Sequence, residues 1–340
     1  MSTQTRMQVD STTIQKYSSY GASMTFSASG KPIRAARVIA LAALLLCATA
    51  PPVLAEAENL RAQTLVIGKV SDSPRKHFTR LKPMVDYVGK KMRDLGITRT
   101  RVLMAKNNAQ MIRYLQQGKV DWVTETLFSS ILFEQQAGAE IILRKWKKGV
   151  PGYHTVFITR KESDIHNLED LKGKRLALED PGSTTAFYIP AGILQEAGLE
   201  LELLSNPRQH PAPDKVGYAF AKGEINIATW VHKGLADVGA YNNLDWNTPD
   251  HTPPVFKKDL RIFHRSSDLP RGFELVRPGL DTSIKQRLIE VLKNTHRDAA
   301  AEAVLNAYQQ TAKFDEISAE TQAILDHVRE HSAVARGNLH

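Results

Sequence analysis

The feature that most constrains the fold is an alternation of short apolar strands and amphipathic helices, which runs through the chain twice. The first cycle opens with an apolar strand at residues 64–68, and a helix is expected over 78–95 because Leu81, Met84 and Val88 recur on one face. The second cycle opens after Tyr153 with a strand at 155–159. Strands alternating with helices are typical of parallel sheets built from βαβ units. Two such cycles predict an α/β chain with two lobes.

The remaining elements set the expected lobe boundaries. We expect further strands at 101–104, 120–123, 175–178 and 226–229, and helices at 108–117, 129–137, 167–173 and 185–197, with another helix ending before Gly223. From Arg261 onward we expect one strand and then mainly helix, too few strands for a third lobe. This part is therefore predicted to fold back onto the first lobe. The predicted division is 56–154 and 256–340 for lobe 1, and 155–255 for lobe 2.

The first 55 residues have the pattern of an export signal. Arg34 and Arg37 precede an apolar run at 38–50, which ends in small residues before Ala55. This order predicts a secretory signal peptide cleaved after Ala55 and a periplasmic location. The run is shorter than the ~20 apolar residues of a membrane-spanning helix. Two alternatives stay open: translation from Met24, and lipid attachment at Cys47, although Leu46 is larger than the residue that normally precedes a lipidated cysteine.

Cysteine content and charge narrow the class of protein. Cys47 is the only cysteine, so a chain cut after Ala55 has no disulfide and depends on its hydrophobic core. Removing the leader takes five of 45 basic and one of 36 acidic residues, which leaves 40 and 35 and a formal net charge of +5. The basic run at 144–148 is of a kind found in nucleic-acid-binding proteins. Export argues against that partner and favours a solvated loop or a docking rim.

The strongest local signal for binding is the polar turn at 180–185, placed between a strand and a helix. Free N–H groups at the start of a helix carry partial positive charge and bind anions. Ser183, Thr184 and Thr185 add hydroxyl donors, and Gly182 lets the backbone approach a ligand closely. These residues predict an oxyanion site without lysine or arginine. The alternative is that Ser183 or Thr184 only caps the helix.

Other loops are expected at the same edges of the sheets. Ligands of open α/β sheets bind at the carboxyl ends of strands, where these loops lie, and two lobes can close over them. Glu125 is expected either to face a ligand amine or to cap the next helix, and Tyr153 and His154 either to line the pocket or to pack at a hinge. The candidates outside the 180–185 turn are Ser71, Thr124, Glu125, Thr126, Tyr153 and His154.

Signatures of catalysis and metal binding are missing from the sequence. His210, His232, His251 and His264 do not have metal-ligand spacing. Ser183 is not in a Gly-x-Ser-x-Gly elbow, and the chain contains no Walker-type phosphate loop. We therefore expect no catalytic residue, no metal and no cofactor, and a protein that is not an enzyme.

Several short motifs occur in an order and spacing that carry a family resemblance across residues 65–278. They are the segments 153–156, 160–165, 168–175 and 180–185, followed by Tyr188, Pro190, 194–198 and 236–240. In this order they resemble the periplasmic phosphate/phosphite/phosphonate-binding proteins of ABC transporters, the PhnD-like family.

The resemblance implies a fold, a role and partners. The fold is the type II periplasmic-binding-protein fold, with two lobes, a central mostly parallel sheet in each, and two hinge crossovers. The role is that of the solute-binding component of an ABC importer. Such a protein is expected to be a monomer that binds one small anionic ligand, docks on an inner-membrane permease and binds no nucleic acid. The turn at 183–185 would hold the ligand oxygens, and Asp237 would either help recognise a ligand amine or cap a strand or helix.

The chain departs from the family pattern at two places. The family commonly has Ser-Thr-Ser-Gly where this chain has Thr185 and Ala186 in the last two positions. In the first lobe the family has Gly-Pro and then tyrosine, where this chain has Thr126, Leu127 and Ser130. The anion-holding turn is kept while the opposite wall differs, so an oxyanion is expected but aminoalkyl-phosphonate specificity is not. The alternatives are a sensing module for a membrane signalling partner, or another oxyanion or small solute such as sulfate.

Overall fold

The computed structural model describes residues 59–71 and 73–337, with side chains as far as residue 330. These residues fall within one unit, Ala57–His340. The predicted signal peptide, its cleavage after Ala55, and the alternatives at Met24 and Cys47 lie outside the described residues. Within the described part of the chain, no helix combines the length and apolar character that crossing a bilayer requires.

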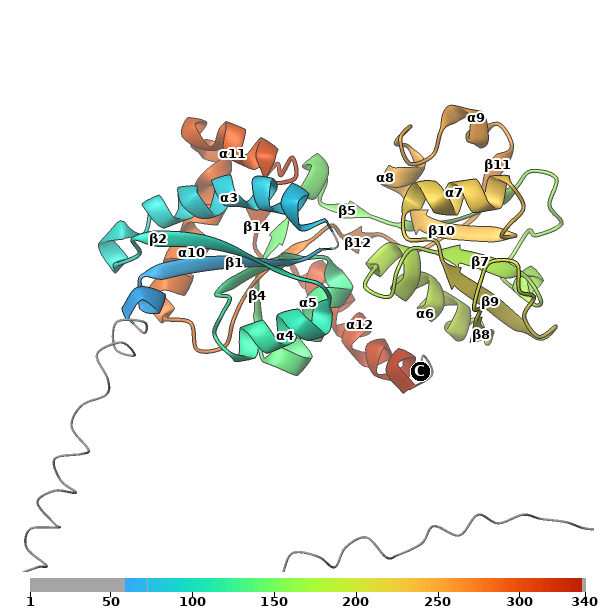
Figure 1. Ribbon diagram of the computed structural model, residues 1–340, viewed down its shortest axis with the longest axis horizontal. Coiled ribbons are helices and arrows are strands. Elements are labelled where there is room, and N and C mark those ends of the chain that lie inside the picture. Colours follow the sequence, from blue (N-terminus) through green and yellow to red (C-terminus); the bar gives the residue numbers. More distant parts are fainter. Residues whose placement is uncertain (1–58, 72, 338–340) are drawn as a thin grey trace, which may run out of the picture. The chain divides into compact units, whose positions relative to one another are not determined.

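Two six-stranded sheets form the framework of the described chain (Figure 1). The first sheet has the order β14 (Phe314–Asp315), β4 (Glu140–Lys145), β13 (Phe273–Val276), β3 (Trp122–Glu125), β1 (Thr64–Val70), β2 (Arg99–Ala105). The second has the order β11 (Leu260–Arg265), β6 (Thr155–Arg160), β10 (Val238–Asn242), β7 (Arg175–Leu178), β9 (Lys215–Phe220), β8 (Glu200–Leu203).

Both sheets are mixed, with an antiparallel strand in the interior of each; the first sheet is less parallel than expected, because β14 also runs antiparallel to β4. In the first sheet β1 pairs in parallel with β2 and β3, and β13 runs antiparallel to both β3 and β4. In the second sheet β7, β8, β9 and β10 run parallel, and β6 lies antiparallel between β10 and β11. The expected α/β class is confirmed.

Helices cover both faces of each sheet, and the central strands β3, β13 and β10 are buried along their whole length. In the first sheet one face packs against α4 (Asn108–Gln116), α5 (Leu127–Ala137) and α12 (Ala319–Gly337), and the other against α3 (Pro74–Lys90), α10 (Thr282–Asn294) and α11 (Glu302–Ala307). In the second sheet α6 (Ile189–Glu196) covers one face, and α7 (Glu224–His232) with α9 (Pro254–Lys257) covers the other. The short α8 (Asn243–Trp246) follows β10 directly.

The chain passes between the two sheets twice, through segments that pair with each other. It leaves the first sheet through β5 (Gly152–Tyr153) and returns through β12 (Leu269–Pro270). These strands are antiparallel, with Tyr153 opposite Leu269. The two crossovers agree with the hinge segments expected for the fold. The second sheet includes β11, which lies beyond the predicted lobe boundary at residue 255, and the lobe division itself stays a prediction.

Three local predictions were wrong. Residues 226–229 belong to helix α7, not to a strand, because the buried positions Ile227, Ala228 and Val231 follow a helical period that a four-residue window cannot reveal. The segment before Gly223 is strand β9, whose continuous apolar run is compatible with either a strand or a buried helix. The C-terminal part contains β11, β12, β13 and β14 rather than one strand. Since β13 and β14 join the first sheet, that part does fold back as expected.

Candidate functional site

The polar turn at 180–185 has a compact internal hydrogen-bond pattern. The Gly182 amide donates to Oδ1 of Asp180 at 2.7 Å, and the Ser183 amide donates to the Asp180 carbonyl at 3.1 Å. The Ser183 hydroxyl accepts from the Ala186 amide at 3.2 Å, so Ser183 caps a π-helical turn, Thr184–Tyr188, which continues into α6. The capping role considered for Ser183 is therefore present in the structure.

Thr184 connects this turn to the first sheet. Its hydroxyl accepts from the Phe128 amide in the first turn of α5 at 3.1 Å and donates to the Thr126 hydroxyl at 3.0 Å. The side chain is buried, with only 3% of Thr184 exposed. Next to it, the rings of Phe128 and Tyr188 stack with their centroids 3.9 Å apart. The turn predicted to bind an oxyanion thus faces the amino terminus of α5, where one backbone amide already donates to an oxygen of the turn.

Glu125 ends β3 and is held by the neighbouring strand. Its carboxylate accepts from the Lys69 ammonium at 3.1 Å and from the Val70 amide at 2.8 Å. It therefore caps the end of β1. It does not cap the next helix, α5, which was one of the two expected roles. Lys69 is itself buried, with 8% of the residue exposed. The pair places a partly neutralised cation at the carboxyl end of the first sheet.

Thr124 points into a buried network behind this end of the sheet. Its hydroxyl donates to Glu274 at 2.9 Å and contacts the Lys145 ammonium. Glu274, fully buried, also accepts from the Trp122 indole and lies 3.4 Å from Lys145. Burial raises the pKa of Glu274, and burial lowers the pKa of Lys145 to about 8, opposed by Glu274. Thr124 thus orients the network, while Thr126 is the residue that contacts the turn.

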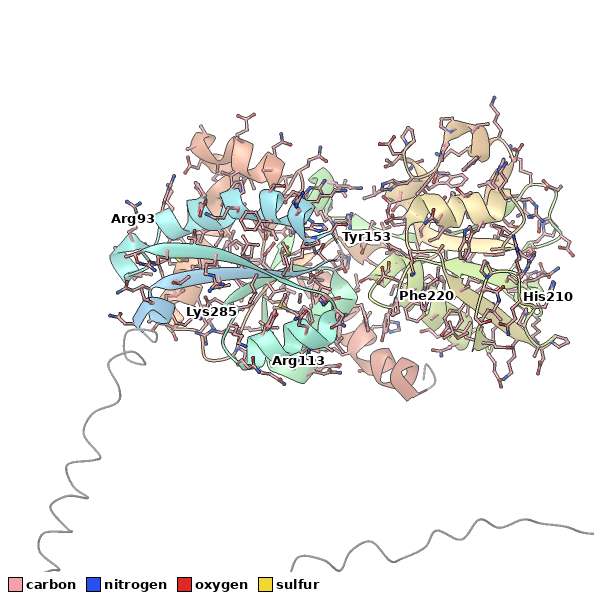
Figure 2. All side chains as sticks on the ribbon, in the orientation of Figure 1. Arg93, Arg113, Tyr153, His210, Phe220 and Lys285 are labelled. Atoms are coloured by element: carbon pink, nitrogen blue, oxygen red, sulfur yellow. The ribbon has the colours of Figure 1, made fainter. Side chains whose placement is uncertain are left out.

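Ser71 and the two crossover residues, Tyr153 and His154, each have different partners. Ser71 contacts Nδ1 of His77 at 2.5 Å, and burial, followed by Lys69 and other cations, lowers the pKa of His77 to about 4. Tyr153 is buried in β5, and Figure 2 labels it on this connecting segment. The ring of His154 contacts Asp268 at 2.9 Å, near the surface. Of the two predicted aromatic residues, Tyr153 is therefore the buried one, and His154 lies nearer the surface.

Asp237 lies at the opposite end of its sheet from these loops. It precedes β10, and its carboxylate accepts from the backbone amide, Nε and a terminal nitrogen of Arg175 at 2.9 to 3.0 Å. Arg175 is the first residue of β7, so the pair sits where the parallel strands begin. The structure does not bring Asp237 together with the turn at 183–185, and its contacts are those of the strand cap that was the alternative.

Two cations near the crossovers were not among the predicted site residues. Arg271 is 4% exposed, and its guanidinium lies over the Tyr153 ring, 4.3 Å from the centroid. Lys147 lies in the turn after β4, and burial, followed by Arg271, Lys69 and Lys145, holds its pKa well below the usual range. Positive charges therefore converge beside the carboxyl ends of β1 and β3.

Carboxylates gather at the corresponding ends of the second sheet. Glu224, Asp245 and His251 place one ligand atom each within 4.8 Å of one another, a set of metal-ligand type that histidine spacing did not reveal. Asp245 contacts His251 at 2.8 Å and Lys148 at 3.4 Å. Burial, followed by Glu224 and more weakly by other carboxylates, raises the pKa of Glu179 to about 8. Glu179 is thus largely uncharged at neutral pH.

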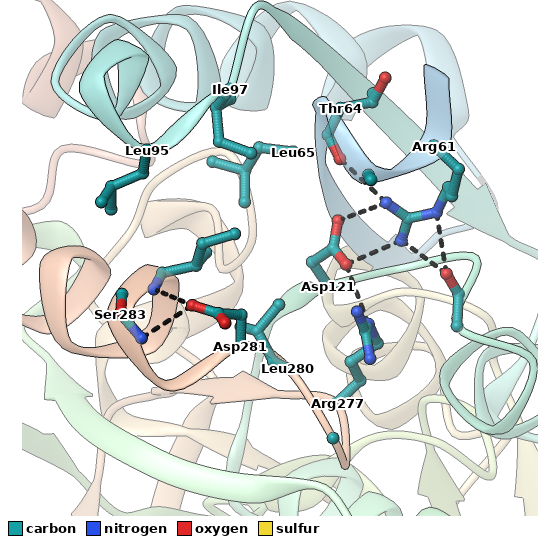
Figure 3. A pocket seen from close by; sticks show the side chains of 14 residues that line it. Arg61, Thr64, Leu65, Leu95, Ile97, Asp121, Arg277, Leu280, Asp281 and Ser283 are labelled. Carbon is teal, nitrogen blue, oxygen red and sulfur yellow. Dashed lines mark hydrogen bonds and ion pairs between the residues drawn. The ribbon is translucent and has the colours of Figure 1, made fainter. Parts of the chain in front are cut away.

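A separate hollow of about 640 Å³ lies at the other end of the first sheet (Figure 3). Asp121 is its central side chain, and it accepts from Arg61 at 2.7 and 3.0 Å and from Arg277 at 2.9 Å. Arg61 also donates to the carbonyls of Thr64 and Gly118. The donors of this arginine are used within the protein, and the hollow adjoins strand beginnings rather than the ends where α/β proteins bind ligands.

Comparison with known proteins decides the family. Residues 68–321 match the model of the periplasmic substrate-binding protein of phosphonate ABC transporters. The chain belongs to this family. It is a periplasmic substrate-binding component of the phosphonate-binding ABC transporter class, a family of binding proteins rather than enzymes, whose members work with a small ligand and a permease.

Individual relatives support this assignment. A protein from Xanthomonas citri, XAC2383, solved bound to chloride ion, is 38% identical with a TM-score of 0.79 and covers 82% of this chain and 100% of its own. The phosphate-import protein PhnD of Mycolicibacterium smegmatis is 25% identical over 70% of this chain and 75% of its own length. The phosphonates-binding periplasmic protein of Escherichia coli is 26% identical over 62% of this chain and 60% of its own.

The fold is that of type II periplasmic binding proteins. PhnD1 from Prochlorococcus marinus shares it with a TM-score of 0.61 at 16% identity, over 81% of this chain and 99% of its own. The predicted fold class and family resemblance are therefore confirmed.

Sequence reasoning missed the charged residues around the turn. Glu179 directly follows β7, Glu224 opens α7 after β9, and Asp245 follows β10, so each stands at a strand end where a binding residue is expected. Misassigning β9 and α7 concealed Glu224. Lys147 belongs to the basic run at 144–148, which was interpreted as a solvated loop or docking rim, and Arg271 carries no comparable signal because its crossover segment has no periodic pattern.

Proposed function

We propose that this family member captures a small phosphorus oxyanion, a phosphonate, phosphate or phosphite, between the carboxyl ends of its two sheets. The donors are the hydroxyls of Thr184 and Thr185, the amide groups of the 182–185 turn, and the first amides of α5. Thr126 and Ser71 supply further polar contacts, and Tyr153 packs beside them. Binding is passive, and the loaded protein passes the ligand to its permease.

The contact between Thr184 and the Phe128 amide carries this proposal. The first N–H groups of a helix have no partner within the helix and carry partial positive charge. In the structure one of them receives the Thr184 hydroxyl oxygen at 3.1 Å. An anionic oxygen in the same place receives a stronger, charge-assisted hydrogen bond, and the Thr184 hydroxyl is then free to donate to the ligand as well.

Surrounding charge favours an anion at this position. Lys69, Lys147 and Arg271 lie around the end of the first sheet, and the only carboxylate that pairs with Lys69 among the described residues is Glu125. On the other side Glu179 adjoins Ser183, and its pKa near 8 leaves it able to donate a hydrogen bond at neutral pH. An oxyanion beside Ser183 therefore meets donors from both sheets.

The functions of the sequence relatives point the same way. The Mycolicibacterium relative is a phosphate-import protein, and the Escherichia relative binds phosphonates. The Xanthomonas relative was solved both with chloride ion and, at 37% identity, with ATP. An anion is common to all four descriptions.

Thermal melting of the exported protein against a panel of anions tests the proposal. The panel is phosphate, phosphite, methylphosphonate, 2-aminoethylphosphonate, sulfate and acetate. A ligand that binds only the folded state raises the melting temperature with its concentration. We expect a shift with at least one phosphorus oxyanion and none with acetate. No shift with any phosphorus oxyanion contradicts the proposal, and a shift with sulfate alone reassigns the ligand.

A further inference from the structure

The buried charges beside the crossovers do not balance. Two ion pairs account for part of the cluster, Lys69 with Glu125 at 3.1 Å and Lys145 with Glu274 at 3.4 Å. Among the described residues, no carboxylate forms an ion pair with Arg271 or Lys147. Arg271, and Lys147 when it is protonated, therefore have no carboxylate partner where the strands of the first sheet end.

Arg271 is the more deeply buried of the two cations. It is 4% exposed, and its buried Nε has no hydrogen-bond partner among the described residues. Taking a charged group out of water is unfavourable unless the group is paired and hydrogen-bonded. Stacking on the Tyr153 ring at 4.3 Å offsets only part of that cost. A buried guanidinium without a carboxylate partner suits an anionic ligand, because the ligand supplies the missing counter-charge when it binds.

Lys147 is held in place by a strained turn. The next residue, Lys148, has φ 55°, and Gln309 and Gln310 opposite it have φ 62° and 54°. The two segments are joined by hydrogen bonds from the Lys148 amide to the Gln309 carbonyl at 3.1 Å and from the Gly149 amide to the Gln310 carbonyl at 3.0 Å. Non-glycine residues in this conformation are strained and collect at functional sites. The turn keeps Lys147 close to Arg271 and Lys69 despite their mutual repulsion.

The cluster adjoins the turn that binds the first anion. The guanidinium of Arg271 lies over the Tyr153 ring. Burial raises the pKa of Tyr153, and Arg271 and a hydrogen bond with Thr185 oppose that rise. Thr155, two residues further along, donates to the Thr185 carbonyl at 2.9 Å. One ligand can therefore reach both places.

We propose that Arg271 and Lys147, assisted by Lys69, form a second anion subsite, and that the natural ligand carries two or more linked phosphoryl groups. The inference rests on the proposed function: one phosphoryl group occupies the 183–185 turn, and the next pairs with the planar guanidinium of Arg271, which suits two oxygens of one group. Within the proposed phosphorus oxyanions, the second subsite thus favours a diphosphate or longer polyphosphate, inorganic or organic, over a ligand with one phosphoryl group.

Calorimetric titration of the exported protein with inorganic phosphate, pyrophosphate and tripolyphosphate tests this inference. We expect pyrophosphate to bind at least tenfold more tightly than phosphate. Arg271→Met should remove most of that difference, and Lys147→Gln should reduce it independently if Arg271→Met does not fold. Lys285→Gln is the charge-matched control, since this lysine lies on α10 and pairs with Glu140 (Figure 2).

The outcomes separate the two proposals. Phosphate binding as tightly as pyrophosphate, or a pyrophosphate preference that survives both Arg271→Met and Lys147→Gln, overturns the second subsite and leaves the oxyanion proposal standing. Binding of none of the three anions, nor of methylphosphonate, overturns the oxyanion proposal and the second subsite with it. A preference lost equally in Lys285→Gln shows general charge attraction and also overturns the subsite.

Discussion

Replacing Thr184 with valine separates a ligand-binding turn from one that only joins the two sheets. Valine has nearly the same shape, so the change removes a single hydroxyl from a site that is 3% exposed. In the unliganded protein the Phe128 amide loses its acceptor and the Thr126 hydroxyl loses its donor. Leaving a buried polar group unpaired costs about 1–3 kcal/mol, and we expect the free energy of unfolding to fall by an amount in that range.

The effect on ligand affinity follows from the same hydroxyl. A hydrogen bond to a charged group contributes about 1.5–3 kcal/mol. Each 1.4 kcal/mol is about tenfold in affinity, so Thr184→Val should weaken oxyanion binding about 10- to 150-fold. Calorimetric titration gives the affinity, and urea denaturation gives the stability of the same preparation.

Thr229→Val is the matched control for this experiment. Its hydroxyl donates to the Ile225 carbonyl within α7, so its removal should leave the affinity unchanged. If Thr184→Val lowers stability but binds phosphate as tightly as the unmodified protein, Thr184 only joins the sheets. The reasoning that places an anion at this turn is then refuted.

Three further predictions concern the buried charges. Lys145→Met leaves Glu274 buried without its cation and should lower the free energy of unfolding by about 3–5 kcal/mol, with partial recovery when Glu274→Gln is added; urea denaturation measures both. Glu179, with a pKa near 8 in the folded chain, binds more protons folded than unfolded between about pH 4.5 and 8, so stability should fall as pH rises through that window. Glu179→Gln should flatten that slope in melts at pH 5 and 8, and an unchanged slope would refute the assignment. Asp237→Asn breaks the pair with Arg175 and should cost about 1–3 kcal/mol without altering oxyanion affinity; a loss of affinity would return Asp237 to the site.

The strands with strong apolar patterns were predictable because burial on both faces leaves a continuous signal. The strand expected at 175–178 is β7, and the strand expected at 155–159 is β6, which extends to Arg160. The turn at 180–185 was also found, because glycine and hydroxyl residues between a strand and a helix have a local physical meaning. Short segments gave no such signal: β12 and β14 have two residues each, which is less than one period of any pattern.

The charged part of the site could not be predicted in the same way. Arg271 is next to Tyr153 only because β5 and β12 pair, a contact between residues more than a hundred positions apart. Glu125 pairs with Lys69 because β1 and β3 are neighbours, although an equally plausible local reading made it a helix cap. Asp237 is the opposite case. Its position in a family-like motif suggested a ligand contact, but it precedes β10 at the edge of the sheet away from the turn at 183–185. Long-range pairing, not local pattern, decides which charges meet.

The most direct test of the central claim is a crystal structure of the exported protein grown with inorganic phosphate. The account predicts phosphate between the 183–185 turn and α5, with one oxygen accepting from the Phe128 amide in place of the Thr184 hydroxyl. Phosphate bound elsewhere, with the contact between Thr184 and Phe128 intact, would contradict it.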